Sequence, residues 1–375
     1  MTKVIVGNWC PGPGEKGFSL YDYESATGSL TFLSHSYGEI AASFLGNDLA
    51  GKHIYATNES DACADGVFSN EVVKLQVSAS GTEIQVADRI SSLGPNPPWI
   101  CGDGKGEYLL IPHHGGFGHT STITRKSDGS LSERLVQDES HIILMRLKKD
   151  GSFDCATDAY LPKKRNKTYK GQMSRTHCIR RAPGKNLFFA CDKGFDCVIS
   201  LAINYEEETI FPLDQIAVSS QESPRYGVCH PRLPIFYADM EGSANVYAFS
   251  YDDKGKLFRR QKLNVLPRPL SESVMPSDIV MDEEGAHLYV AIRKENVIAV
   301  IGLDKDGGMS LQTVAENPDG APNILRFSPD RQFMFVTNVF EKVISKFLIR
   351  ADGSLQYMGI AARDVCPASM VFVEM

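Results

Sequence analysis

The sequence predicts an all-β protein: a seven-bladed β-propeller of four-stranded antiparallel blades. Two observations carry this prediction. The 375-residue chain has no long stretch of helical periodicity. Short β-rich runs with turn residues between them recur with a period of roughly fifty residues, which is typical of a repeat architecture. A solenoid is the alternative, but it would usually show a shorter period and distinct capping repeats.

Each repeat unit contains a second strand that ends in polar residues and a later turn that contains glycine. The second-strand segments are residues 4–8, 54–58, 109–113, 188–192, 236–240, 289–292 and 335–338. The turns include Asp252-Asp253-Lys254-Gly255 and Asp352-Gly353, where glycine supplies the positive φ that a tight turn needs. These signals place the strands of each blade in chain order.

The two ends of the chain are expected to complete one blade together. Residues 367–372 match the first strand of a unit but have no following strands, and residues 4–9 match a second strand without a predecessor. Pairing these segments would remove an exposed sheet edge. We therefore expect residues 1–375 to form a single propeller domain.

Two segments interrupt the repeat. The third unit is too long, and residues 117–140 are expected to be an insertion. Residues 162–175 form a loop rich in basic residues. This loop is either solvated or a lid over an anionic ligand, and both interpretations stay open.

Composition excludes several classes of protein. The net charge of −7 disfavours nucleic-acid binding. The sequence has no run of 18 apolar residues, so no membrane span is predicted. The start of the chain lacks the pattern of a secretory signal, so we expect a cytoplasmic protein. Nine cysteines without CxxC spacing are then expected to be reduced thiols. The oligomeric state stays open.

Aligning the units predicts two rings of residues around one mouth of the channel, because first-strand starts and second-strand ends lie at the same end of an antiparallel pair. The first-strand column reads Ala42, Trp99, His177, Arg225, Ser277, Asn323 and Ala368. The second-strand column reads Trp9, Glu59, His114, Lys193, Glu241, Arg293 and Val339. So many charged groups converging on one point indicate a binding site.

These residue types suit chemistry on an anion. Arg225 and Arg293 present forks that match carboxylate or phosphate oxygens, and Lys193 is a possible third cation. The cations should keep Glu241 ionised as a general base, while His177 can titrate near neutrality and give or take a proton. Lactone hydrolysis needs such a set, and so does the addition of a carboxylate to a double bond. The alternatives are a purely structural Arg–Glu pair and a hydrogen-bonded histidine at a strand end.

Several short stretches carry a resemblance to a known family. They are Val6-Gly7-Asn8-Trp9, Thr176-His177-Cys178, Ser223-Pro224-Arg225, residues 239–245 and Ala291-Ile292-Arg293. In order and spacing the whole chain resembles the seven-bladed lactonase family, which includes bacterial 6-phosphogluconolactonases and fungal carboxy-cis,cis-muconate cyclases. The resemblance implies a catalytic set of His177, Arg225, Glu241 and Arg293.

Seven further residues of the two rings are expected to bind substrate. They are Trp9, Glu59, Trp99, His114, Lys193, Ser277 and Asn323. The expected function is hydrolysis of a sugar-acid lactone. The substrate is expected to be a small anion, and no cofactor is expected. The alternatives are a lactone-forming cycloisomerase and a non-catalytic propeller that binds a ligand or a protein.

Other motifs are weaker. Gly12, Gly14 and Gly17 form GxGxxG, but a strand and not a helix is expected to follow, so a dinucleotide site is not predicted. No metal site is expected, although a cluster of His113, His114 and His119 leaves the question open. The sequence contains no GxSxG motif, so a serine hydrolase is not indicated.

Overall fold

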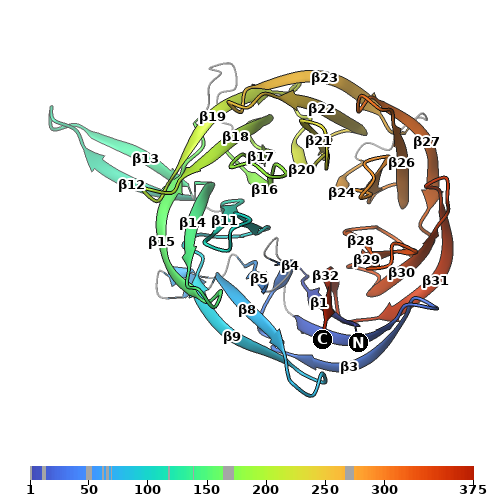
Figure 1. Cartoon of the computed structure of the whole chain (residues 1–375). Coiled ribbons are helices and arrows are strands. Elements are labelled where there is room, and N and C mark those ends of the chain that lie inside the picture. The colour runs from blue at the N-terminus through green and yellow to red at the C-terminus, as the bar shows by residue number, and fades with distance from the viewer. Residues whose placement is uncertain are drawn as a thin grey trace.

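Seven four-stranded antiparallel sheets surround a central axis (Figure 1). The computed structural model describes residues 2–10, 14–47, 53–60, 63–64, 67–68, 70–116, 119–137, 139–163, 173–266 and 274–375. Within these ranges every regular element is a strand. The prediction of a seven-bladed β-propeller is confirmed, and the described part of the chain holds no helix that could cross a membrane.

We number the blades from the N-terminus. Blade 1 contains β1 (Thr2–Asn8), β2 (Gly17–Glu24), β3 (Ser29–Ser36) and β32 (Pro367–Glu374); blade 2 contains β4 (Ala42–Asn47), β5 (Ile54–Asn58), β8 (Glu71–Val77) and β9 (Ile84–Ser91); blade 3 contains β10 (Cys101–Gly102), β11 (Tyr108–His113), β14 (His141–Leu147) and β15 (Phe153–Tyr160). Blade 4 contains β16 (Thr176–Arg181), β17 (Phe188–Asp192), β18 (Cys197–Asn204) and β19 (Thr209–Ala217); blade 5 contains β20 (Pro224–Cys229), β21 (Ile235–Met240), β22 (Asn245–Tyr251) and β23 (Leu257–Asn264). Blade 6 contains β24 (Pro276–Met281), β25 (His287–Ile292), β26 (Val297–Leu303) and β27 (Met309–Glu316); blade 7 contains β28 (Leu325–Phe327), β29 (Phe333–Asn338), β30 (Val343–Ile349) and β31 (Leu355–Arg363).

Blade 1 closes the ring by pairing the two ends of the chain. β32 runs antiparallel to β1, with Thr2 opposite Glu374 and Gly7 opposite Ser369. The pairing continues past the strands, because the Trp9 amide donates to the Cys366 carbonyl over 2.9 Å. Closure through the termini was predicted, and it leaves the innermost strand of this blade with a partner.

Burial between neighbouring blades explains why the second and third strands are almost wholly apolar. Every residue of β17 is buried, and its Phe189 stacks on Phe236 of blade 5 with ring centroids 5.0 Å apart. A fully buried phenylalanine contributes about 1.5–3 kcal/mol by leaving water. Outer strands such as β9 alternate partly buried and exposed residues, since one face meets solvent.

A repeated hydrogen bond connects consecutive blades at glycine turns. A tyrosine hydroxyl on the second strand of one blade donates to a glycine carbonyl in the turn between the third and fourth strands of the next blade. The pairs are Tyr55 with Gly151 (2.8 Å), Tyr237 with Gly307 (2.8 Å) and Tyr289 with Gly353 (2.9 Å). The three glycines have φ of 74°, 78° and 81°, in the left-handed region that favours glycine.

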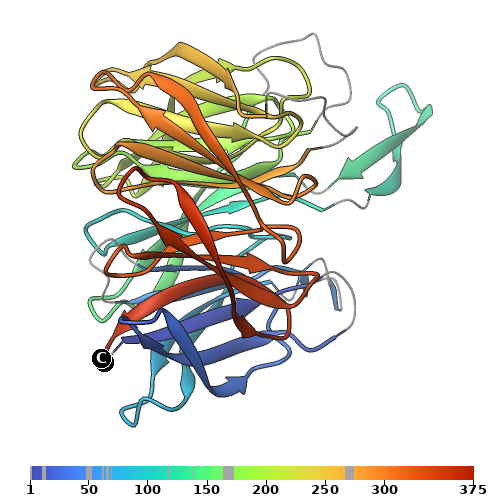
Figure 2. The same cartoon turned by 90° about the vertical axis from the view of Figure 1, so that its right-hand side faces the viewer.

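Two short hairpins, each paired only with itself, stand apart from the seven sheets. β6 (Cys63–Ala64) pairs with β7 (Val67–Phe68), and β12 (His119–Arg125) pairs with β13 (Leu131–Gln137). The β12–β13 hairpin belongs to the segment 117–140 and projects away from the ring (Figures 1 and 2). Of the basic loop at 162–175, residues 164–172 lie outside the described residues, so the structure does not test whether it forms a lid.

Candidate active site

Bulges at the starts of the first strands turn functional side chains toward the channel. In blade 4, Thr176 pairs with Asp192 and Cys178 with Cys191, so His177 is an extra residue. In blade 5, Arg225 and Tyr226 together lie opposite Asp239, and the Tyr226 amide donates to the Asp239 carboxylate over 2.7 Å. A bulge re-aims a side chain that regular pairing would bury in the sheet.

Nine of the eleven predicted site residues line one cavity of about 430 Å3 at this mouth. They are Trp9, Glu59, His114, His177, Lys193, Arg225, Glu241, Arg293 and Asn323. Six of these nine residues belong to the second-strand column, and each follows directly on the last residue of a second strand, so the propeller repeat places them on one ring. A volume of this size suits a small molecule.

Trp99 and Ser277 do not line this cavity, contrary to the sequence-based expectation. In blade 3 the first strand has only two residues, and Pro98 faces the cavity instead while Trp99 is buried below it. Ser277 is also fully buried; its hydroxyl donates to the Pro322 carbonyl over 2.8 Å, and its own carbonyl accepts from Arg225 Nη1. Ser277 therefore positions Arg225 from behind.

Glu241 is the electrostatic centre of the cavity. Its carboxylate forms an ion pair with Lys193, lies 3.3 Å from Arg225 Nε and lies 3.7 Å from Arg293 Nη2. Burial raises the pKa of Glu241, but Arg225, Lys193 and Arg293 outweigh burial and lower this pKa to about 2. The prediction that neighbouring cations keep Glu241 ionised agrees with this geometry.

The two histidines of the cavity are neutral in the free protein. Burial, followed by the charges of Arg225 and Lys193, lowers the pKa of His177 well below its usual value. Burial and Lys193 lower the pKa of His114 to about 3. The two rings meet edge to face with centroids 5.8 Å apart. The expectation that His177 titrates near neutrality is therefore wrong for the unliganded protein.

Glu59 is the second carboxyl group of the cavity, and its environment differs from that of Glu241. Burial raises the pKa of Glu59, while a hydrogen bond from Ser43 and the charges of Arg225 and Lys193 oppose this without cancelling it. The backbone carbonyl of Glu59 accepts from Trp9 Nε1 over 3.2 Å. Two carboxyl groups with opposite pKa shifts in one cavity are the pattern of an acid and a base.

Several buried polar atoms around the cavity have no hydrogen-bond partner in the described structure. They are His177 Nδ1, Arg225 Nε and the Nε and Nη2 atoms of Arg293. The contacts of Glu241 with the two arginines are close in distance but lack hydrogen-bond geometry. The charge of the two guanidinium groups suits an oxyanion in the cavity.

The sequence reasoning missed the aromatic side of the cavity. Tyr226 lines it, its ring 5.0 Å from the His177 ring and 4.4 Å from the Arg225 guanidinium carbon. Lys16, Ser43, Ser60 and Asn96 line it as well. The position of Tyr226 directly after Arg225 was the available signal, but an aromatic residue inside a strand is usually core.

His113 and His114 of blade 3 do not share one site. His114 lines the cavity, whereas His113 is fully buried and stacks on His141 with centroids 4.4 Å apart. The side chain of His119 lies outside the described residues. Among the residues that the structure describes, no group of three or more His, Cys, Asp or Glu side chains is placed to hold a metal ion.

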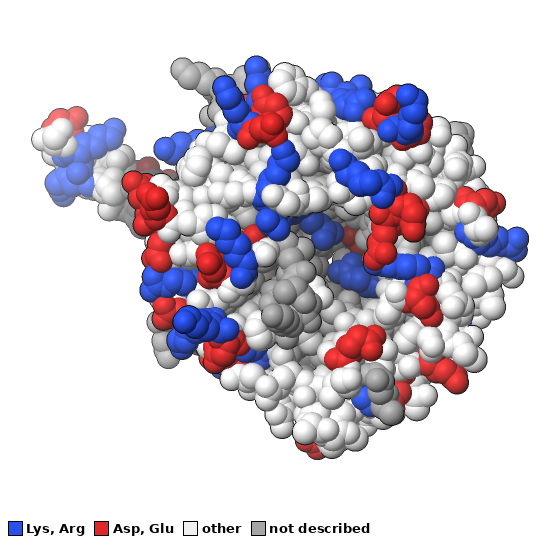
Figure 3. All heavy atoms as spheres, in the orientation of Figure 1, with Lys and Arg blue, Asp and Glu red and all other residues white. Residues whose placement is uncertain are grey.

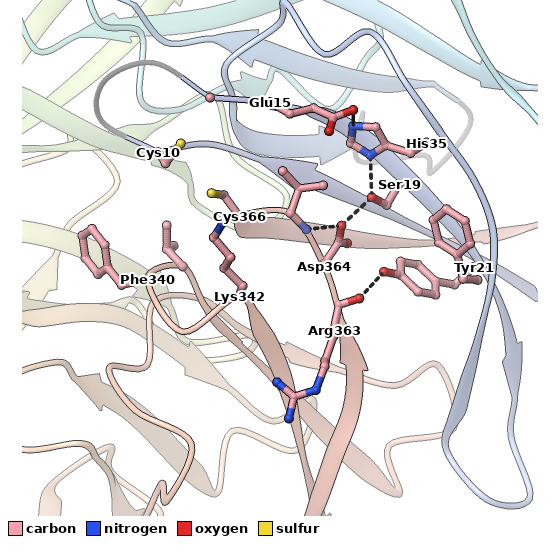
Figure 4. A pocket seen from close by; sticks show the side chains of 14 residues that line it. Cys10, Glu15, Ser19, Tyr21, His35, Phe340, Lys342, Arg363, Asp364 and Cys366 are labelled. Carbon is pink, nitrogen blue, oxygen red and sulfur yellow. Dashed lines mark hydrogen bonds and ion pairs between the residues drawn. The ribbon is translucent and has the colours of Figure 1, made fainter.

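Another cavity, of about 690 Å3, lies between blades 7 and 1 and contains a serine, a histidine and an acid (Figure 4). Ser19 is fully buried and donates to Asp364 Oδ1 over 2.6 Å, while it also contacts His35 Nδ1 at 2.9 Å and accepts from Asn8. Because the serine proton points to Asp364 and no solvent reaches the hydroxyl, this set joins the two ends of the ring and does not act as a nucleophile.

A closed propeller with an arginine- and lysine-rich cavity around one ionised glutamate defines a protein with a small-molecule cavity whose charges suit an anion. The chain matches the model of the family described as lactonase, 7-bladed β-propeller, over residues 3–363, and it belongs to that family. The resemblance drawn from the sequence is confirmed, and the enzyme class is that of a lactonase.

Relatives span nearly the full length of the chain. A 6-phosphogluconolactonase of Formosa agariphila is 23% identical over 351 residues, covering 92% of this chain and 91% of that protein. A 6-phosphogluconolactonase of Bacillus subtilis is 23% identical over 354 residues, covering 90% and 89%. The structure of the periplasmic gluconolactonase of Pseudomonas aeruginosa has a TM-score of 0.83 at 18% identity and covers 100% of this chain and 99% of its own, which shows the shared fold.

Proposed function

We propose that the protein hydrolyses a sugar-acid lactone that carries a phosphate, as its 6-phosphogluconolactonase relatives are named to do. The observation that carries this proposal is the ring of Lys193, Arg225 and Arg293 around Glu241. With Glu241 ionised, these four groups have a net charge of +2, which complements a phosphate dianion. That the substrate is a lactone is inferred from the names of the relatives, which are 6-phosphogluconolactonases.

Glu241 is assigned as the base that takes a proton from the attacking water. A pKa of about 2 makes it a weak base in the free protein. An anionic substrate that binds Arg225, Lys193 and Arg293 would draw their charge away from Glu241, and the pKa of Glu241 would rise. Substrate binding thus activates the base.

Ring opening then needs an oxyanion site and a proton donor. Arg225 is assigned to the carbonyl oxygen, on which negative charge develops, while Lys193 and Arg293 bind the phosphate. Glu59, whose raised pKa favours its protonated form, gives a proton to the ring oxygen as the carbon–oxygen bond breaks. One water is consumed, a hydroxyl and a carboxylate form, and one proton is released.

His177 is assigned a hydrogen-bonding role in place of proton donation. Its imidazole is neutral, and its Nδ1 atom is buried without a partner at the cavity. A neutral ring offers one donor and one acceptor to a substrate hydroxyl group. Asn323 and His114 line the same cavity and are assigned to substrate binding.

The test compares 6-phosphogluconolactone with unphosphorylated gluconolactone. Acid release in a pH-stat, corrected for spontaneous hydrolysis, is expected to be faster with enzyme and to favour the phosphorylated lactone. Equal rates on the two lactones would contradict the proposal that the protein recognises the phosphate group. No acceleration of either, together with conversion of a carboxylated muconate, would instead favour the cycloisomerase. Binding of a lactone without turnover would favour a non-catalytic propeller.

We infer a cytoplasmic location for this activity. All eight cysteines that the structure describes are free thiols, which suits a reducing compartment. A redox-state measurement of the protein in cell extracts tests this, and extensive disulfide formation in the native protein would contradict it.

A further inference from the structure

The channel has a second cavity at its opposite mouth. It has a volume of about 530 Å3 and is lined by residues at the ends of the first strands, whereas the active-site cavity lies at their starts. We call it the distal cavity and define it by Phe44, Trp99, Arg180, Arg181, Arg326 and Arg331. Figures 1 and 3 look onto this face, on which both chain termini lie.

The described residues that line the distal cavity include four arginines and no acidic residue. This is unusual for a chain with a net charge of −7. Figure 3 shows Lys and Arg side chains around the central hollow. Arg331 is paired with Glu283, and Arg326 lies 3.4 Å from the buried Asp278. No carboxylate of the described chain forms an ion pair with Arg180.

Arg180 and Arg326 are held rigidly by neighbouring blades. Arg180 Nε donates to the Gly227 carbonyl over 2.8 Å, and Arg326 Nε donates to the Met370 carbonyl over 3.2 Å. Each bond fixes the direction of a guanidinium group, so little side-chain entropy remains to be lost when a ligand binds. Burial lowers the pKa of Arg326, and the charge of Arg180 lowers it further. An anion between the two guanidinium groups would relieve that repulsion.

An aromatic pair forms the floor beneath these guanidinium groups. The rings of Phe44 and Trp99 stack with centroids 3.8 Å apart. The guanidinium carbon of Arg180 lies 4.2 Å from the Trp99 ring, and that of Arg326 lies 6.0 Å from the Phe44 ring. The floor is also the partition between the two cavities, because Trp99 contacts Tyr226 of the active site with centroids 4.7 Å apart.

We propose that the distal cavity is a second ligand site, for a small organic oxyanion with an apolar body. Arg180 and Arg326 bind the carboxylate or phosphate group, and the apolar body packs on partly exposed apolar side chains of the lining, such as Val228, Met281 and Val371. The site is separate from the cavity in which we place lactone hydrolysis, and its existence does not depend on that function.

The two tryptophans of the chain make a direct test possible, since Trp9 lines the active site and Trp99 the distal cavity. In a Trp9→Phe variant, Trp99 is the sole indole. Titration with phenyl phosphate is expected to change its fluorescence saturably. Benzoate in place of phenyl phosphate compares a carboxylate with a phosphate group. Inorganic phosphate, which lacks the ring, shows what the apolar body adds to binding. Phenol is the uncharged control.

Variants assign the signal to one cavity. Arg180→Gln in this background is expected to weaken phenyl phosphate binding about 10- to 100-fold, as the loss of a charged hydrogen-bonding partner predicts, while Arg180→Lys weakens it less. Arg293→Gln, in the active site, should leave the signal in place. Arg350→Gln is the control for a lost surface charge, because Arg350 lies in an exposed turn. Calorimetry gives a second readout, since Arg180 touches the reporter ring.

Three outcomes would overturn the proposal. The first is a signal that is lost in Arg293→Gln and kept in Arg180→Gln, because the anion would then be in the active-site cavity. The second is equal binding by the parent protein and Arg180→Gln in calorimetry. The third is no saturable binding of any of the charged probes. Thermal unfolding and lactone turnover of Arg180→Gln, both expected to be near those of the parent, establish that the variant is folded.

Discussion

Arg225 and Glu241 are sixteen residues apart in the chain, and Arg225 Nε lies 3.3 Å from Glu241 Oε1. A bulge at the start of β20 turns Arg225 into the channel, and Glu241 follows directly on the last residue of β21. The contact is therefore a local property of one antiparallel pair. Lys193 and Arg293 reach the same carboxylate from the equivalent positions of blades 4 and 6.

Replacing Glu241 with Gln is expected to lower kcat for lactone hydrolysis by about 10²–10⁴-fold, the range typical of a lost general base. KM should change little, because Lys193, Arg225 and Arg293 still bind the anion. Steady-state kinetics on the phosphorylated lactone measures both constants. Glu283→Gln is the matched control, because it removes a carboxylate from the exposed ion pair with Arg331, and it should leave kcat unchanged. An unchanged kcat in Glu241→Gln would remove Glu241 from the mechanism.

The ring of charged residues was predictable because the propeller repeat itself sets it. Each second strand ends just before a member of the column, so counting along the repeats was enough to bring Glu59, Lys193, Glu241 and Arg293 together. The first-strand column was less secure. In blade 3 the first strand, β10, has only two residues and gives no periodic signal. The alignment therefore placed Trp99 at the mouth, whereas its neighbour Pro98 lines the cavity there.

The protonation states could not be read from residue types. His177 was expected to titrate near neutrality, but its burial and the positions of Arg225 and Lys193 are properties of the folded ring. The side chain of Ser277 is turned away from the mouth by contacts with blade 7 that no motif encodes. The distal cavity escaped notice for the same reason, since Arg180 and Arg326 belong to no repeated column.

The pH dependence of kcat/KM should lack an ionisation of His177 near pH 6.5. This ratio reports the free enzyme, in which burial and neighbouring cations lower the pKa of His177 well below its usual value. The imidazole is therefore neutral at neutral pH. In kcat, which reports the substrate complex, the bound anion is expected to move this pKa upward.

Profiles of the parent and of His177→Gln measure the effect. Two-dimensional NMR of the histidine rings provides an independent titration of the unliganded protein. A His177 resonance that titrates between pH 6 and 7 would contradict the neutral assignment.

Asp239 should make the protein less stable as the pH rises toward neutrality. Burial raises the pKa of Asp239 to about 7, although a hydrogen bond from the Tyr226 amide opposes the rise. The folded state then holds a proton that the unfolded chain loses near pH 4. Its stabilising contribution is complete below that pH and is lost as the pH rises through about 7, at about 1.4 kcal/mol per pH unit in between.

Urea unfolding of the parent protein and of Asp239→Asn at pH 5, 6 and 7 isolates this contribution. The asparagine keeps an acceptor for the Tyr226 amide but cannot ionise, so the difference in stability between the two proteins should change with pH. A difference that stays constant over this range would show that Asp239 ionises normally.

The tyrosine bonds between blades should contribute to stability separately from one another. Tyr55→Phe and Tyr289→Phe each remove one buried hydroxyl that donates to a glycine carbonyl of the next blade. Each is expected to reduce the free energy of unfolding by about 1 kcal/mol. Because the two bonds join different blade pairs, the double variant should lose the sum. Tyr251→Phe is the control, since no hydrogen bond of its hydroxyl is found within the described structure. Chemical unfolding of the four variants decides the point: a double variant much less stable than the sum would mean that a break in one blade contact spreads around the ring.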